Sequence, residues 1–295
     1  MERSVFSPAK LNLFLAVTGR RADGFHDLVS LAAPLDFGDE LAARPAGRAI
    51  GPQFSLACDD PAVPVDASNL VLRAAAAFAA ATGWRDAVHF RLTKRIPAGA
   101  GLGGGSSNAV AALRVLNELA GRPLAPEALA GLAAGLGSDC ALFLANAPVV
   151  MRGRGERVAP LAAAAAARVS GRRVLLFKPD FSIGTAWAYG RMVATGTDYR
   201  QPAEAEARLA AWLDGAARAE ELLANNMEGV AFEKFIALPV MLAGLRREFG
   251  LAPRMSGSGS ACYALLGDDG VTEPIGAYIR ARWGPTAFIQ AARLA

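Results

Sequence analysis

A glycine-rich stretch, residues 97–108, has the composition of an anion-binding site. It consists of Pro-Ala-Gly-Ala-Gly-Leu-Gly-Gly-Gly-Ser-Ser-Asn and is followed by an apolar run over residues 109–119. Glycines adopt positive φ and let an oxyanion approach the backbone closely, while the first turn of a helix presents unpaired N–H donors. Ser106, Ser107 and Asn108 are residue types that begin helices well. The alternative is a flexible linker, but glycines placed between Pro97 and a strong helix former favour a phosphate-binding loop.

Two common phosphate loops fit this stretch less well. The Walker pattern ends in Gly-Lys-Ser/Thr, whereas here the corresponding residues are Gly104-Gly105-Ser106, which excludes a P-loop. Three glycines of the run satisfy the dinucleotide fingerprint GxGxxG, but the acid expected about twenty residues later would be Glu118, inside the predicted helix. A Rossmann oxidoreductase is therefore a weaker alternative.

Three isolated polar residues near the N-terminus are further candidates. Residues 9–17 alternate as in a strand, which places Lys10 and Asn12 on one side, about 7 Å apart. On this pattern alone, a solvated strand lysine is favoured over a functional one. His26 directly follows a polar turn, and a substrate contact and a half-exposed loop histidine are equally compatible with that position.

Asp139 is a lone acid at the start of an apolar segment, after Gly137 and Ser138. Acids in such positions are usually helix caps, which the residue pattern favours. The alternative is a catalytic carboxylate that a helix N-terminus and a nearby cation keep ionised.

Hydrophobic periodicity predicts the elements that must position these residues. Strands are expected over residues 9–17, 88–92, 173–178, 262–266 and 287–291. Helices are expected over residues 70–82, 109–119, 126–135, 203–212, 225–235, 238–249 and 273–283, with another that begins at residues 182–185. A second glycine-serine cluster, residues 255–261, is either a plain turn or a concave anion nest that meets the first loop across the domain junction.

Composition restricts the class of protein. The chain has 295 residues, 53% hydrophobic and 20% charged, which is enough for two globular domains. Its net charge of +4 is scattered without a basic block, which favours a small anionic substrate over nucleic acid. We expect no membrane span and no signal peptide. Three dispersed cysteines and only two histidines predict reduced thiols in a cytoplasmic protein and no histidine metal centre.

Three separated motifs together resemble those of the GHMP kinases, the superfamily of galacto-, homoserine, mevalonate and phosphomevalonate kinases. These motifs are residues 8–13 with 24–26, residues 97–108 and residues 257–260. The similarity runs almost from end to end, and residues 18–24 and 101–108 resemble the members that phosphorylate a cytidine diphosphate-linked methylerythritol for non-mevalonate isoprenoid synthesis.

The resemblance implies an α+β fold of two domains. The first, residues 1–157, would be a ribosomal-protein-S5-like domain with the ATP-binding glycine loop. The second, residues 158–295, would be a ferredoxin-like domain that completes the substrate site. The resemblance also implies ATP and Mg²⁺ as cofactors and a small-molecule substrate. It would be a protein without nucleic-acid or membrane partners, either a monomer or a homodimer.

Residue roles follow from the same resemblance. Lys10 and Asp139 match the catalytic pair, and Asn69 with Leu70 match the adenine pocket. The positions that match the loop around the ATP phosphates are Pro97, Ala98, Gly99, Ala100, Gly101, Leu102, Gly103, Gly104, Gly105, Ser106 and Ser107. The positions that match the surroundings of the cytidine are Asn12, Phe25, His26, Thr185 and Tyr189, where Tyr189 would stack on the cytosine ring. The metal ligands are unknown, with Ser107 and Asp139 as candidates.

This chain departs from the family pattern at two places. Phe25 stands where the family often has tyrosine, so a contact through that hydroxyl is absent, and Cys140-Ala141 replaces a frequent Val-Pro pair. Two further functions stay open: a kinase for another small alcohol, such as homoserine or mevalonate, and a non-catalytic nucleotide-binding regulator.

Overall fold

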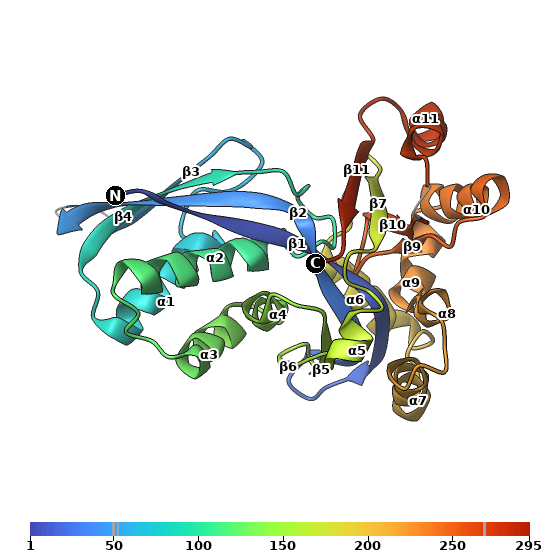
Figure 1. The fold of residues 1–295 in the computed structure, drawn as a ribbon, viewed down its shortest axis with the longest axis horizontal. Coiled ribbons are helices and arrows are strands. Elements are labelled where there is room, and N and C mark those ends of the chain that lie inside the picture. Colours follow the sequence, from blue (N-terminus) through green and yellow to red (C-terminus); the bar gives the residue numbers. More distant parts are fainter. Residues whose placement is uncertain (49–50, 52, 268–269) are drawn as a thin grey trace. The chain divides into compact units, whose positions relative to one another are not determined.

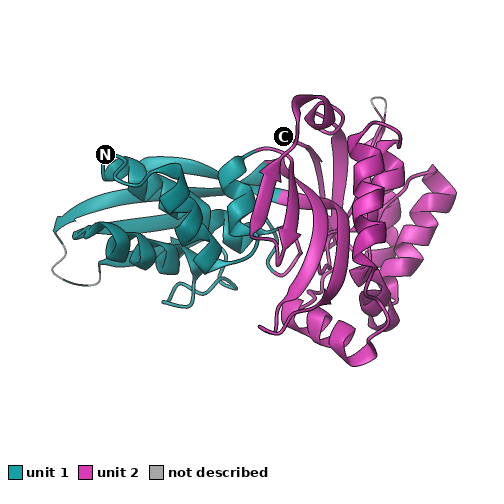
Figure 2. Cartoon of the chain, turned by 90° about the horizontal axis from the view of Figure 1, so that it is seen from below, with its two compact units in different colours: residues 1–9, 37–98, 103–146 teal, residues 10–36, 99–102, 147–295 magenta. Residues whose placement is uncertain are grey.

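The computed structural model describes residues 1–48, 51, 53–267 and 270–295, which form the mixed α+β architecture that the resemblance implies. Figure 1 shows the order of its helices and strands. Spatial contacts divide the chain into two compact units, coloured separately in Figure 2. Unit 1 comprises Met1–Ala9, Phe37–Ala98 and Gly103–Asn146, and unit 2 comprises Lys10–Asp36, Gly99–Leu102 and Ala147–Ala295. In the described ranges, no helix is both long and apolar enough to span a bilayer.

Two long strands, β1 (Arg3–Arg20) and β2 (His26–Arg48), contribute residues to both units. The contact-based division therefore groups segments that are far apart in the sequence. The boundary between residues 157 and 158, and the S5-like and ferredoxin-like types of the two domains, stay predictions.

Unit 1 is a small sheet covered by helices. In it, β2 pairs antiparallel with β4 (Asp86–Thr93), and β3 (Phe54–Cys58) pairs parallel with β4. Its helices are α1 (Leu70–Thr82), α2 (Gly104–Leu119), α3 (Pro126–Leu136) and α4 (Cys140–Ala145). Helices α1 and α2 pack on each other and on one face of the sheet (Figure 1).

The ends of α1 follow from its sequence. The Asn69 side chain accepts a hydrogen bond from the Val71 amide at 2.9 Å, and Gly83 terminates the helix with φ +71°. These are the usual N-terminal cap and left-handed glycine stop. The predicted helix over residues 70–82 is confirmed at both ends.

Unit 2 contains a second, four-stranded sheet with the strand order β11-β7-β10-β9. The strands of this sheet are β7 (Arg173–Lys178), β9 (Arg254–Met255), β10 (Cys262–Leu265) and β11 (Phe288–Arg293). Unit 2 also contains β5 (Val149–Gly153), β6 (Arg157–Pro160) and β8 (Ala224–Asn225), which belong to the first sheet. Its helices are α5 (Ala163–Ala166), α6 (Thr185–Thr195), α7 (Pro202–Leu213), α8 (Ala219–Leu222), α9 (Met227–Lys234), α10 (Ala237–Phe249) and α11 (Thr272–Trp283). Phe177 of β7 and Trp283 of α11 pack with ring centroids 5.8 Å apart, which anchors α11 to the sheet.

The strand pairing excludes the Rossmann alternative. That fold requires a parallel sheet with crossover helices. Here β7 pairs antiparallel with both β10 and β11, and β2 pairs antiparallel with both β4 and β5. The glycine loop therefore does not belong to a dinucleotide-binding βαβ unit.

Candidate active site

The glycine loop has the backbone of an anion cradle. Gly99, Gly101 and Gly103 adopt φ values of +59°, +75° and +73°, a conformation that side chains rarely tolerate. Gly103 is the N-terminal cap of α2 and makes no side-chain capping bond, so the amides of the first turn remain as donors at the helix start.

Helix α2 begins earlier than the sequence predicted, where Ser106, Ser107 and Asn108 were expected to precede it as cap residues. It starts at Gly104, so these three residues lie inside its first turns. The polar side chains have other partners, because Ser107 accepts a hydrogen bond from Ser7 at 2.8 Å and Asn108 donates to Asp39 at 3.1 Å. They attach the helix start to unit 1 instead of capping it.

The second glycine-serine cluster meets the first loop within unit 2. We call residues 255–261 the glycine–serine loop. The Ser256 hydroxyl donates to the Gly101 carbonyl at 3.2 Å, and the Ala261 amide donates to the Ala100 carbonyl at 3.1 Å. The two loops are in contact, but both contacting segments belong to unit 2, so the expected meeting across a domain junction is not what the contacts show. The glycine–serine loop contains a turn, closed by a hydrogen bond of 2.9 Å from the Gly259 amide to the Ser256 carbonyl.

Lys10 is buried at the junction of these two loops. Its side chain is 4% exposed, and its Nζ donates to Asn12 Oδ1 at 2.6 Å. Asn12 Nδ2 donates in turn to Ser30 Oγ at 2.9 Å. The alternation of residues 9–17 favoured a solvated strand lysine, and this prediction is wrong because residues on both faces of this part of β1 are buried.

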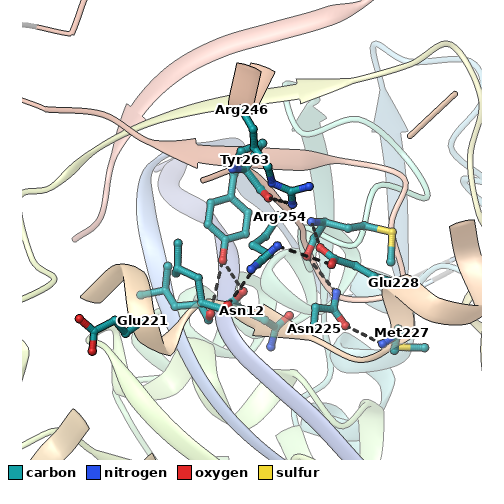
Figure 3. Close-up of polar contacts among 12 residues, drawn as sticks. Asn12, Glu221, Asn225, Met227, Glu228, Arg246, Arg254 and Tyr263 are labelled. Atoms are coloured by element: carbon teal, nitrogen blue, oxygen red, sulfur yellow. Dashed lines mark hydrogen bonds and ion pairs between the residues drawn. The ribbon is translucent and has the colours of Figure 1, made fainter. Parts of the chain in front are cut away.

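The backbone around Asn12 is also anchored from the second sheet. The buried Tyr263 hydroxyl donates to the Asn12 carbonyl at 3.1 Å (Figure 3). The Lys10 amide donates to the Leu102 carbonyl at 2.9 Å, which ties the strand to the glycine loop. Strand β1 therefore holds the ammonium group of Lys10 in a defined place beside the glycine loop.

An aromatic cluster in unit 2 surrounds His26. The ring centroid of His26 lies 4.6 Å from that of Tyr189 on α6 and 5.9 Å from that of Tyr199. His26 Nε2 and the Tyr199 hydroxyl share a hydrogen bond of 3.1 Å. Burial, together with the charge of Arg20, lowers the pKa of His26, which favours the neutral form of the imidazole. A neutral ring has one donor and one acceptor nitrogen, which suits recognition of a polar ring edge.

Thr185 and Tyr189 connect this cluster with the glycine–serine loop. They are four residues apart on α6 and therefore share a helix face. The Thr185 hydroxyl lies 3.0 Å from that of Ser258. Phe25 is 47% exposed and has the Arg154 guanidinium 4.7 Å from its ring centroid. The substrate-binding candidates of unit 2 are thus brought together around β1, the turn before β2 and α6.

In unit 1, the C-terminal half of the glycine loop adjoins Leu70 and the segment of Asp139. A Cβ placed on Gly105 would lie 3.5 Å from Leu70 Cδ1. Asp139 occupies the N-terminal cap position of α4, but its carboxylate makes no capping bond among the described residues. Burial raises the pKa of the neighbouring Cys140 thiol to about 11, and a hydrogen bond with Ser106 opposes this shift. The capping role that the pattern favoured for Asp139 is therefore not fulfilled by its side chain.

Sequence reasoning missed Asp39, which organises the entry to the glycine loop. Its carboxylate is fully buried and accepts from Lys94 Nζ at 2.5 Å and from the Arg95 and Ile96 amides at 2.7 and 2.8 Å. The Asn108 side chain supplies the fourth donor. The acid joins the end of β4 to α2, on either side of the loop, and its partners lie 55 or more residues away in sequence.

We predict that Asp39→Asn lowers the free energy of unfolding by about 3–5 kcal/mol, because the Lys94 ammonium loses a buried counter-charge. Urea unfolding followed by circular dichroism measures this change. Glu40→Gln, on the exposed neighbouring residue, is the matched control. The double variant Asp39→Asn/Lys94→Gln, which makes both partners neutral, should recover part of the loss. An Asp39→Asn midpoint equal to that of Glu40→Gln would contradict the prediction.

The site contains no preformed metal cluster among the described residues, since no three His, Cys, Asp or Glu side chains are grouped to hold an ion. All three cysteines are free thiols, as expected.

Comparisons with known proteins identify the family of the chain. Residues 69–153 match the family model described as GHMP kinases N terminal domain. The chain is 40% identical over 276 residues to the 4-diphosphocytidyl-2-C-methyl-D-erythritol kinase of Synechococcus sp. strain CC9902, covering 90% of this chain and 88% of the relative.

Solved structures share the whole fold. A crystal structure of 4-(cytidine 5'-diphospho)-2C-methyl-D-erythritol kinase superposes with a TM-score of 0.75 and 34% identity, covering both chains completely. The Methanococcus jannaschii mevalonate kinase superposes with a TM-score of 0.74 at 11% identity, covering 100% of this chain and 99% of that one, which shows the fold alone.

The fold and the glycine loop that begins α2 define a GHMP kinase, a small-molecule phosphotransferase. Within this class, the 40% identity to a relative over 90% of this chain specifies one family. The chain belongs to the family of 4-diphosphocytidyl-2-C-methyl-D-erythritol kinases.

Proposed function

We propose that this chain transfers the γ-phosphoryl group of ATP to the 2-hydroxyl of 4-diphosphocytidyl-2-C-methyl-D-erythritol, a step of non-mevalonate isoprenoid precursor synthesis. The observation that supports it most is the buried Lys10 ammonium, hydrogen-bonded to Asn12 where the two loops meet. A buried cation beside an anion cradle suits the charge of a transferring phosphoryl group.

The phosphates of ATP would lie on the amides of the glycine loop and of the first turn of α2. Asn69 and Leu70 would contact the adenine, consistent with the position of Leu70 beside Gly105. Phosphoryl transfer needs in-line positioning and charge stabilisation more than covalent participation of the protein. In this proposal Asp139 orients the acceptor hydroxyl and takes its proton, while Lys10 stabilises the phosphoryl oxygens.

Ser107 and Asp139 have the hard oxygen donors that suit Mg²⁺, and the ATP phosphates would complete its coordination. When bound, the ion would neutralise charge on the β- and γ-phosphates. We also propose a cytoplasmic protein that is a monomer or a homodimer, which light scattering after gel filtration would decide.

His26, Phe25 and Tyr189 would recognise the cytidine part of the substrate, with Tyr189 stacked on the cytosine ring. Asn12 and Thr185 would contact the same substrate. Because α6 carries both Thr185 and Tyr189, a single helix would position the base and the groups next to the glycine–serine loop.

The decisive experiment is a coupled ADP-release assay with the cytidine diphosphate substrate and a panel of other alcohols, including homoserine and mevalonate. We expect turnover with the cytidine compound alone. Turnover with another alcohol instead would overturn the substrate assignment. Tight ATP binding without ADP release on any alcohol would support a non-catalytic regulator.

Tyr199→Phe removes the hydroxyl that shares a hydrogen bond with His26. For a bond worth ~1 kcal/mol, we expect the KM for the cytidine substrate to rise about fivefold with the KM for ATP unchanged. Tyr278→Phe is the matched control, because Tyr278 packs on Phe249 between α10 and α11. Steady-state kinetics with each substrate varied in turn would test this, and equal KM values in the two variants would refute a role of Tyr199 in positioning His26.

A further inference from the structure

We propose that Asn225 in β8 and Glu228 in the first turn of α9 are positioning residues that hold the glycine–serine loop against the Lys10 ammonium in the arrangement needed for phosphoryl transfer. The inference rests on the proposed function. It assigns a role in turnover to two side chains that the sequence did not single out.

Asn225 uses both ends of its amide group. The side chain belongs to a residue only 5% exposed, and its Nδ2 donates to the Met255 carbonyl at 2.9 Å and to the Gly257 carbonyl at 2.8 Å. Its Oδ1 accepts from the Met227 amide at 3.0 Å. Figure 3 shows this amide group with its bonds. Because both the Nδ2 and the Oδ1 of Asn225 are hydrogen-bonded, the side chain is held in one orientation.

Glu228 holds the same loop from a second point. Its Oε1 accepts from the Met255 amide at 2.9 Å, and its Oε2 lies 4.0 Å from Arg254 Nη1 (Figure 3). Burial raises the pKa of this carboxyl, while the Met255 amide, Arg254 and Arg246 lower it. Met255 is therefore fixed through its N–H by Glu228 and through its C=O by Asn225.

The held segment lies directly against Lys10. A Cβ placed on Gly257 would be 3.4 Å from Lys10 Nζ, 3.4 Å from Asn12 Oδ1 and 3.1 Å from the Gly101 carbonyl. Gly257 has φ +56°, so only a glycine allows this approach without strain. Displacement of Gly257 would change the space in which the ammonium lies.

Asn225 also sets the direction of a peptide group. In a planar trans peptide, the N–H of a residue points opposite to the preceding carbonyl. Because the Gly257 carbonyl is held by Asn225, the Ser258 amide points away from Asn225. In the part of the chain that the structure describes, that amide donates no hydrogen bond, so it is available for an anionic oxygen.

Asn225 further belongs to the strand system that carries Lys10. It lies in β8, which pairs parallel with β1 in the register Leu15↔Asn225. The side chain thus connects the strand of Lys10 with the loop that covers its ammonium.

The test compares Asn225→Ala, Glu228→Ala and Glu228→Gln in the ADP-release assay. We expect kcat to fall about 10- to 100-fold in the two alanine variants, because small misplacements of reacting groups slow transfer strongly, while each KM stays within about threefold. Glu228→Gln keeps an acceptor for the Met255 amide and should retain most of the activity. Glu221→Gln, on the exposed carboxylate of α8 labelled in Figure 3, is the matched control.

Three outcomes distinguish the possibilities. No ADP release by the unmodified chain would refute the proposed function. Wild-type kcat in Asn225→Ala, or equal losses in Glu228→Gln and Glu228→Ala, would overturn the inference, as would a loss that only follows the folded fraction measured by circular dichroism. If Asn225→Ala does not fold, the Glu228 pair decides. Combination with Lys10→Ala should add little further loss, because residues that act as one unit are not additive.

Discussion

Asp139→Asn is expected to lower kcat by about 10²- to 10⁴-fold while ATP binding stays intact, because asparagine cannot accept the proton of the acceptor hydroxyl. The exchange keeps the size of the side chain. It also removes no capping bond from α4, since the carboxylate makes none there among the described residues. Single-turnover kinetics and a separate titration with ATP would measure chemistry and binding independently.

Glu127→Gln is the control for this change, because Glu127 is an exposed acid in the first turn of α3 in the same unit. Near-normal turnover in Asp139→Asn would show that the hydroxyl loses its proton without this carboxylate. Lys10→Ala should also reduce kcat strongly, and the double variant should lose little more than the single ones, because the two residues would act together.

Gly101→Ala is expected to lower turnover by at least about 100-fold, through displacement of the glycine loop. A Cβ on Gly101 would lie 2.2 Å from the Ser256 carbonyl oxygen and 3.0 Å from the Gly259 amide nitrogen, which are backbone atoms that cannot rotate away. The residue also has φ +75°. Nucleotide titration and the ADP-release assay would measure the loss, with the KM for ATP rising as the loop opens.

Gly121→Ala is the control that separates the effect of backbone strain from the effect of a steric clash of the new Cβ. Gly121 has φ +77°, but a Cβ there would meet nothing within 4 Å. Alanine at that position therefore costs only the left-handed conformation, about 1–2 kcal/mol, with turnover unchanged. If both alanine variants behaved alike, the contact between the glycine loop and the glycine–serine loop would not control the site.

The elements that could be predicted are those with local causes. The cap at Asn69 and the stop at Gly83 lie in the residues next to α1, so the helix over residues 70–82 was predictable to the residue. The strand over residues 173–178 was likewise predictable from its own apolar run. The start of α2 was not, because the side chains of Ser107 and Asn108 bond to Ser7 and Asp39, far away in the sequence.

By itself, the sequence predicted a phosphate-binding loop without a Walker lysine, and its motifs indicated a resemblance to the GHMP kinases. Glycine content, helix caps and hydrophobic periodicity are local properties of the sequence, so they can be recognised without knowledge of the fold.

Only the tertiary structure decided that Lys10 is buried beside Asn12 and Gly257, and that Asp39, Tyr199 and Asn225 hold the surroundings of the site. The physical reason is the distance between partners along the chain. Asp39 and Lys94 are separated by 55 positions, and His26 and Tyr199 by 173. No local pattern records such a hydrogen bond, so the burial of Lys10 beside the glycine loop could be established only from the fold.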